Sequence, residues 1–155
     1  MEFNFQIKLM TVKILLFIAG FVLIISIATI FSLKKIIKKR ISNFKKRFNE
    51  YKIIEYERFA NCFGVQSKGY VQIRGNGILL LTKQFLFFQM IFPKKELLLP
   101  LSDIRESKIT MSHLGKTKGK KLLKIVFTND SGKKDSVAFL VSNLDIWLKQ
   151  LKSRA

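Results

Sequence analysis

Four lysines gather in one short stretch and are the residues best suited to contact a ligand. They are Lys116, Lys118, Lys120 and Lys121, and two neighbouring glycines give the stretch the freedom of a loop. Ammonium groups on nearly alternate residues can meet several phosphate oxygens at once as point charges. We therefore expect this loop to bind an anionic ligand; the alternative is an ordinary solvated hairpin tip.

The other reactive residue types are too few for catalysis or metal binding. The chain has one cysteine, Cys62, and one histidine, His113, so it cannot assemble an ordinary zinc site or an internal disulfide alone. We expect Cys62 to be buried and His113 to lie at a surface or sheet edge. Residues 115–117 read Gly-Lys-Thr, but position 110 is Thr where a phosphate-binding P-loop needs Gly. We predict a protein that is not an enzyme and uses no cofactor.

Residues 14–33 form an apolar run that no charged residue interrupts. Twenty helical residues at about 1.5 Å each span roughly 30 Å, the thickness of a bilayer's hydrocarbon core. The hydroxyls of Ser26, Thr29 and Ser32 can bond to the helix's own carbonyl groups. We predict one transmembrane helix rather than a cleaved signal peptide, whose apolar core is shorter. Ala28 and Ser32 form a small-xxx-small pair through which two spans can pack.

Basic residues follow this run at once. Eight Lys or Arg lie within 34–47, whereas only two lysines precede the run. Because excess positive charge stays in the cytoplasm, we predict that residues 1–13 lie outside the cell membrane and residues 34–155 inside. The cations nearest the bilayer then face anionic headgroups. We expect lipid contacts from Lys34, Lys35, Lys38, Lys39 and Arg40.

Residues 34–60 contain no Gly or Pro, and their apolar residues recur every three or four positions. This spacing predicts a basic amphipathic connector helix. Its apolar face consists of Ile37, Ile41, Phe44, Phe48 and Tyr51. Three uses of this face remain open: it lies on the inner leaflet, forms a short coiled coil, or packs on the domain that follows.

Residues 61–155 form the predicted globular domain, which is mainly β. Short β-prone runs alternate with turn signals, and Gly-Asn-Gly at 75–77 predicts the first hairpin turn. No helix lies between the strands, which excludes a parallel βαβ architecture. The seven predicted antiparallel strands cover residues 70–74, 78–82, 84–92, 96–101, 104–112, 121–128 and 136–141.

An amphipathic helix ends the chain. Leu144, Trp147, Leu148 and Leu151 form its apolar stripe, and the Ser-x-x-Asp spacing at 142–145 predicts a capping box at its start. The stripe must be buried, and the open end of a curved sheet is the place for it. We expect Trp147 to supply the largest part of that contact.

These segments resemble a known family. The runs GNGILLLTKQFLFF (75–88), ELLLPLSDI (96–104) and KLLKIVF (121–127), followed by a helix with a Trp, resemble the GRAM branch of the pleckstrin-homology-like superfold. Small single-span membrane proteins carrying this domain are also similar. The resemblance implies a seven-stranded, strongly bent sheet, or partly open barrel, capped by a C-terminal helix. Its structural residues here are Gly77 and Trp147; Asp103 lies in a turn where a carboxylate caps backbone amides.

The family resemblance implies binding of lipids or peptides rather than catalysis. The net charge of +19 is spread over both halves of the chain, so anionic phospholipid headgroups are the expected partner beside a membrane. Residues 68–70 open like an RNA-binding RNP1 box, but residues 71–72 break the pattern, and we expect no nucleic-acid partner. The alternative is a protein-interaction or scaffold module, in which a peptide or second copy adds along a sheet edge or the C-terminal helix.

Overall fold

The computed structural model describes residues 2–153, except the side chains of residues 2–5, 7–9 and 45. The chain divides into two compact units, Met1–Lys46 and Arg47–Ala155. Each unit is described by itself.

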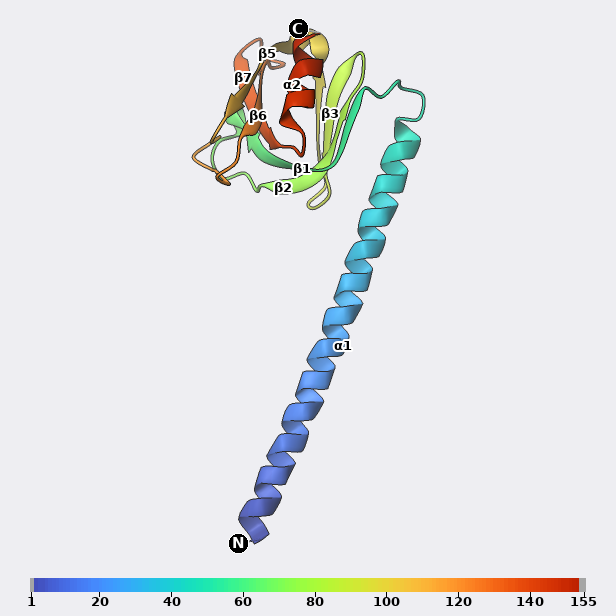
Figure 1. The fold of residues 1–155 in the computed structure, drawn as a ribbon, viewed down its shortest axis with the longest axis vertical. Coiled ribbons are helices and arrows are strands. Elements are labelled where there is room, and N and C mark those ends of the chain that lie inside the picture. Colours follow the sequence, from blue (N-terminus) through green and yellow to red (C-terminus); the bar gives the residue numbers. More distant parts are fainter. Residues whose placement is uncertain (1, 154–155) are drawn as a thin grey trace. The chain divides into compact units, whose positions relative to one another are not determined.

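The first unit is one long helix, α1 (Glu2–Arg47), whose last residue belongs to the second unit (Figure 1). It contains the predicted span, and Met10–Phe44 is long and apolar enough to cross a membrane. The Ser26 hydroxyl donates to the Val22 carbonyl and the Thr29 hydroxyl to the Ser26 carbonyl, each at 2.8 Å, as predicted. The large side chains exposed over the predicted span are apolar, among them Phe17 and Leu23.

The second unit is built on a single antiparallel sheet in the order β4-β3-β2-β1-β7-β6-β5, so β4 and β5 are its edges. A C-terminal helix, α2 (Leu144–Lys152), follows the last strand. This confirms the predicted seven-stranded sheet with its closing helix. The strands are β1 (Glu55–Val65), β2 (Gly75–Leu81), β3 (Phe85–Met90), β4 (Lys95–Pro100), β5 (Ile104–Thr110), β6 (Leu122–Thr128) and β7 (Lys134–Leu140).

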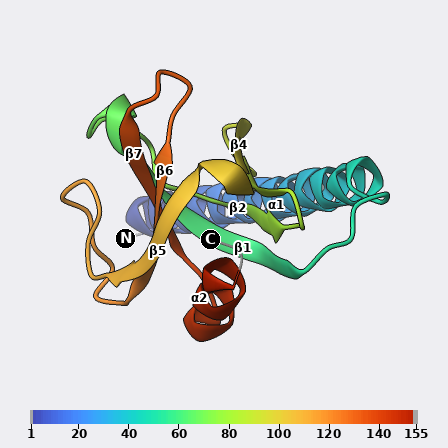
Figure 2. The ribbon, with the colours of Figure 1, turned by 90° about the horizontal axis from the view of Figure 1, so that it is seen from above.

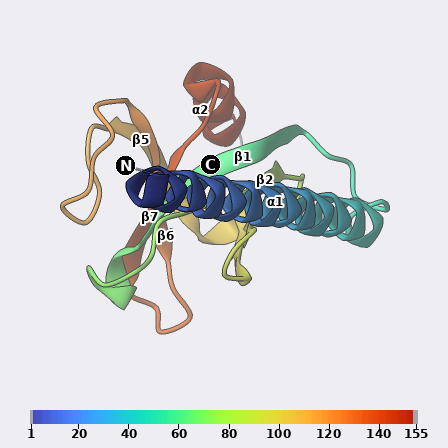
Figure 3. The same ribbon diagram turned by 90° about the horizontal axis from the view of Figure 1, so that it is seen from below.

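The long central strand β1 bends the sheet around its core. Its register shifts between Glu57 and Ala60 and again between Cys62 and Val65, and it pairs with both β2 and β7. Such irregularities bend a strand and increase its twist. Figures 2 and 3 show α2 between β5 on one side and β1 on the other. Trp147 is 1% exposed there and packs into the core, which confirms its predicted role.

Two predicted boundaries around β1 are wrong. The connector helix was expected to run to residue 60, but α1 ends at Arg47 and β1 begins at Glu55. The predicted strand 70–74 is a connection between β1 and β2. There the Gln72 side chain bonds to both backbone groups of Val65, accepting from its N–H at 2.9 Å and donating to its carbonyl at 2.6 Å. A side chain therefore takes the place of a strand partner.

The predicted turn at 75–77 is also wrong, because these residues begin β2. Gly77 is buried, and a Cβ there would overlap the Gln89 carbonyl and the Phe88 ring of the neighbouring β3. Gly75 is similarly crowded by Met90. The glycines are needed for close approach of side chains and backbone rather than for a turn.

Two predicted capping roles also differ in the structure. Asn143, not Ser142, is the N-cap of α2 and accepts from the Ile146 N–H at 3.4 Å. The Ser142 N–H and hydroxyl instead donate to the Glu57 carboxylate at 2.9 and 3.0 Å. Asp103 accepts from the Ser102 hydroxyl at 3.1 Å rather than from a backbone amide. In each case another side chain takes the group that was predicted to cap: the Glu57 carboxylate takes the Ser142 hydroxyl, and the Ser102 hydroxyl takes the Asp103 carboxylate.

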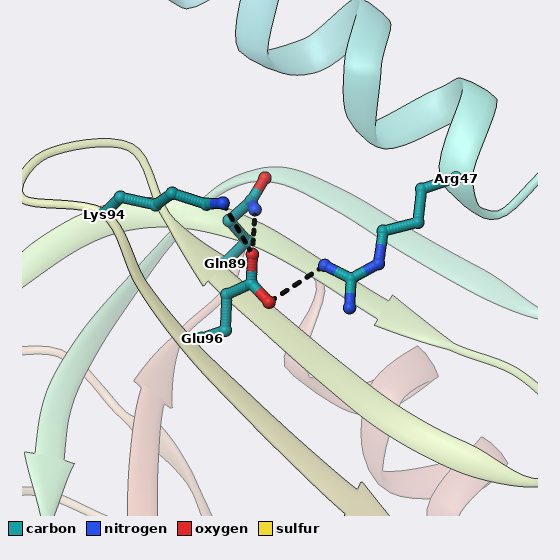
Figure 4. Close-up of polar contacts among 4 residues, drawn as sticks. All are labelled: Arg47, Gln89, Lys94 and Glu96. Atoms are coloured by element: carbon teal, nitrogen blue, oxygen red, sulfur yellow. Dashed lines mark hydrogen bonds and ion pairs between the residues drawn. The ribbon is translucent and has the colours of Figure 1, made fainter.

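The segment that leads into the sheet is attached to the outer face of β3 and β4. The Phe48 ring lies 4.8 Å from that of Phe87, centre to centre, and the Arg47 guanidinium stacks over both rings. Arg47 also pairs with Glu96 at 2.9 Å, and Gln89 and Lys94 contact the same carboxylate (Figure 4). The hydrogen bond from Arg47 is the main reason why the pKa of Glu96 lies below its usual value. For Phe48, packing on the domain is therefore confirmed.

Candidate functional site

The lysine loop, residues 111–121, connects β5 to β6 and is held in shape by its own backbone and hydroxyl groups. The N–H of His113 donates to the Lys116 carbonyl and the N–H of Lys116 to the His113 carbonyl, at 2.9 and 3.0 Å. The Thr117 hydroxyl donates to the Met111 carbonyl at 2.8 Å and accepts from the Gly119 N–H at 3.1 Å. Gly119 has a φ of +65°, a conformation that side chains other than glycine disfavour.

The four lysines predicted to bind together do not share one role. The Lys116 ammonium donates to the Gln72 carbonyl at 2.6 Å, so it braces the β1–β2 connection. This bond gives Lys116 a partner within the sheet domain, and its contact with an anionic ligand stays a prediction. Lys118, Lys120 and Lys121 are exposed and line one groove. Sequence spacing could not separate them, because the partner of Lys116 is a backbone carbonyl 44 residues away.

The groove has a volume of about 780 Å³ and runs from the lysine loop to the start of α2. Its polar lining includes Asn61 and Asn76 of β1 and β2, which are joined by a hydrogen bond of 2.7 Å. The remaining lining residues are Phe59, Ile109, Leu140, Val141, Ser142, Asn143, Leu144 and Asp145. The site combines three cations with amide, hydroxyl and apolar groups.

The electrostatics of the groove favour an anion at its lysine side. Three ammonium groups supply nine N–H donors and no acceptor. Asp145, in the first turn of α2, places the only carboxylate among the lining residues at the other end. A ligand with an anionic group and an uncharged polar or apolar part would fit both ends.

The remaining basic candidates lie elsewhere. Lys34, Lys35, Lys38, Lys39 and Arg40 lie on α1, in the first unit. The first four have exposed side chains. Their contact with lipid stays a prediction.

His113 is buried, which contradicts its expected surface position. Its Nε2 lies 3.0 Å from the Gly64 carbonyl oxygen, and burial is the main cause that lowers the pKa of the imidazole. Since a carbonyl only accepts, the neutral ring must carry its proton on Nε2. This residue therefore fastens the lysine loop to β1; no sequence signal distinguished it from a surface histidine.

Cys62 is buried, as predicted. Burial raises the pKa of its thiol to about 11, so the thiol is protonated at neutral pH. A protonated thiol is a poor nucleophile and a poor metal ligand. Among residues 2–153, no three His, Cys, Asp or Glu side chains come together in a way that would hold a metal ion.

Neither a comparison with protein-family profiles nor one with curated proteins finds a match. Among solved structures, the C-terminal domain of an unknown protein from Leishmania infantum has a TM-score of 0.47 and 16% identity, over 73% of this chain and 94% of that one. The Vps36 N-terminal PH domain has a TM-score of 0.48 and 17% identity, over 66% and 77%. A chain in the 8S snRNP assembly intermediate has a TM-score of 0.48 and 8% identity, over 66% and 77%. At such values these similarities say nothing about a ligand.

Proposed function

We propose that this chain is a single-pass membrane protein whose sheet domain is a non-enzymatic, pleckstrin-homology-like binding module of the GRAM type. In this proposal α1 crosses the cell membrane, and the domain contacts anionic lipid headgroups at the inner leaflet. The observation that carries it is the convergence of Lys118, Lys120 and Lys121 on one groove, in a chain that also has an exposed apolar helix long enough to span a bilayer.

Tethering makes weak contacts sufficient. A domain held near the leaflet experiences a high effective concentration of headgroups, so a modest affinity gives substantial occupancy. Each Lys near an anionic surface contributes about 1 kcal/mol before screening. The lysine groove would therefore orient the domain on the membrane rather than recruit it.

The test follows individual lysines in the full-length protein. It is reconstituted into nanodiscs of phosphatidylcholine, with or without phosphatidylglycerol, and acetylation of each lysine is measured by mass spectrometry. We expect protection of Lys118, Lys120 and Lys121 only in the anionic nanodiscs, fading with added salt. Lys133, on the β6–β7 connection, is the matched control and should react equally in both.

The alternative is a protein-interaction module, in which a peptide or second copy adds along an edge strand, β4 or β5, or along α2. It predicts equal acetylation of the groove lysines in both nanodiscs, together with a concentration-dependent dimer or a saturable peptide complex. That combination would replace lipid binding as the proposed function.

A further inference from the structure

Two connections in the sheet domain expose large apolar side chains without burying them against the described part of the chain. In the β1–β2 connection, Val71 is 97% exposed, Tyr70 70% and Ile73 61%. In the β3–β4 connection, Phe92 is 80% exposed. Isolated exposed apolar residues are ordinary, but four large ones confined to two neighbouring tips form a patch.

The β1–β2 connection is braced rather than loose. The Gln72 side chain bonds to Val65 and donates to the Gly69 carbonyl at 2.6 Å, and the Gln72 backbone carbonyl accepts from the Lys116 ammonium. Arg74 donates to the Thr117 carbonyl at 3.2 Å. These bonds leave Gln72 turned inward and Val71 turned outward. The apolar residues are therefore held in the exposed position by polar contacts on both sides.

The two tips border a common depression. A pocket of about 350 Å³ is lined by Lys68, Gln72 and Ile73 of the first connection and by Met90 and Lys95 beside the second. Figure 1 shows the β1–β2, β3–β4 and β5–β6 connections on the same side of the domain, its lower side in that view. The apolar tips and the lysine loop therefore lie on one face.

Charge complementarity identifies the surface that this face fits. Residues 66–74 and 91–95 contain Lys68, Arg74, Lys94 and Lys95 but no Asp or Glu. The nearby carboxylate of Glu96 is occupied by Arg47, Gln89 and Lys94. Apolar side chains ringed by cations match the interfacial region of an anionic bilayer, where the apolar groups leave water and the cations meet headgroups.

We propose that Val71 and Phe92 insert into the interfacial region of an anionic bilayer, with Tyr70 and Ile73 beside them. This inference rests on the proposed function and extends it, since it assigns the membrane contact of the domain to a face with two apolar tips as well as the lysine groove.

The experiment uses full-length protein reconstituted into vesicles of phosphatidylcholine, with or without phosphatidylglycerol. Val71→Cys and Phe92→Cys are made in a Cys62→Ala background and labelled with an environment-sensitive fluorophore. Ser131→Cys, at an exposed position on the β6–β7 connection, is the matched control. Thermal unfolding of each labelled variant identifies any that does not fold. For such a position, labelling moves to Tyr70→Cys or Pro93→Cys.

We expect blue-shifted emission and strong quenching by a lipid-borne quencher at 71 and 92 in anionic vesicles, with neither at 131. Water-like emission at 71 and 92 would overturn insertion. A blue shift without lipid quenching would also overturn it, because a second copy or another protein would then cover the tips.

Acetylation of the same samples separates this inference from the proposed function. Protected groove lysines with water-like probes would leave headgroup contact standing and remove insertion. Quenched probes with unprotected lysines would support insertion and move the lipid contact away from the groove. Failure of both readouts would remove both.

Discussion

The apolar side chains of α1 and those of the sheet domain are of the same types but lie in opposite environments. Over the predicted span in α1, residues such as Phe17 and Leu23 are exposed, whereas in the sheet Leu79 and Phe139 are fully buried. The strands bury one another because they fold into a bent sheet closed by α2. A single helix has no such option and satisfies only its polar groups. The apolar side chains over the span in α1 are not buried within this unit, and we propose that lipid covers them.

The largest expected effect comes from placing charge in the apolar run of α1. Val22→Lys combined with Ile25→Lys should prevent stable insertion, since a Lys at a helix centre costs about 3 kcal/mol in membrane integration. Carbonate extraction would then release the variant from the membrane fraction. Ile53→Lys, an exposed position outside α1, is the control and should stay in the pellet. Retention of the double variant would contradict the difference between the two regions.

The next effect concerns the core of the sheet domain. Trp147→Ala should lower the free energy of unfolding by about 3–5 kcal/mol, because it removes the largest buried side chain of α2 and leaves a cavity. Denaturant unfolding of the full chain in detergent, followed by fluorescence of a label on the sheet domain, measures this. Ile146→Ala, at the neighbouring exposed position, should change it by less than about 1 kcal/mol. Equal effects would mean that α2 does not close the sheet.

Acid should weaken the sheet domain through His113. Burial and the charges of Lys124 and Lys116 lower its pKa, while the bond to Gly64 and the charge of Asp135 act in the opposite direction. Near pH 6.5, His113 therefore takes up a proton in the unfolded chain but stays neutral in the folded chain. The free energy of unfolding should fall as the pH drops below about 6.5, by up to about 1.4 kcal/mol per unit.

Unfolding curves at pH 7.5 and 5.5 test this, because His113 is the only histidine in the chain. His113→Gln keeps an amide donor for Gly64 and should remove the dependence over this range. An unchanged slope in that variant would show that another group titrates.

The smallest effect is expected at the partly exposed ion pair of Arg47 and Glu96. A double-mutant cycle with Arg47→Gln and Glu96→Gln should give a coupling of about 0.2–1 kcal/mol, as solvent screens such pairs. The pair of Lys108 and Glu106, in which each side chain is 47% exposed, is the control and should couple less. If the coupling between Arg47 and Glu96 is no larger than that of the control pair, the ion pair does not stabilise this contact. The stacking of Arg47 on Phe48 and Phe87 would then be what holds the segment on the sheet.

Sequence patterns predicted the elements whose burial is regular. The stripe of α2 and strands β2 to β7 could be placed within a few residues, because turn signals separate the strand runs and the apolar residues of α2 recur at helical spacing. β1 could not be placed, because two register shifts break its alternation and one of its two partners, β7, lies near the far end of the chain. Residues 70–74 have strand-like composition but no free backbone partner, since the Gln72 amide takes the groups of Val65.

The candidate site was predicted in part. The four lysines can be recognised in the sequence as a run of charge. That Lys116 bonds to the Gln72 carbonyl while the other three line a groove beside α2 depends on tertiary contacts, which residue spacing does not reveal. The exposed tip at Val71 was overlooked for a related reason. A short apolar run such as residues 70–73 is typical of a buried strand. In the structure the Gln72 side chain turns inward to bond with Val65, and the apolar side chains beside it therefore face outward.

Protease protection of the full-length protein in cells, read with an antibody against the sheet domain, tests the central claim most directly. We expect the domain to survive protease added to intact cells and to be digested in inside-out membrane vesicles, with the protein remaining in the carbonate-washed membrane pellet. Digestion of the domain in intact cells, or recovery of the whole chain in the soluble fraction, would contradict anchoring by α1 with the domain at the inner leaflet.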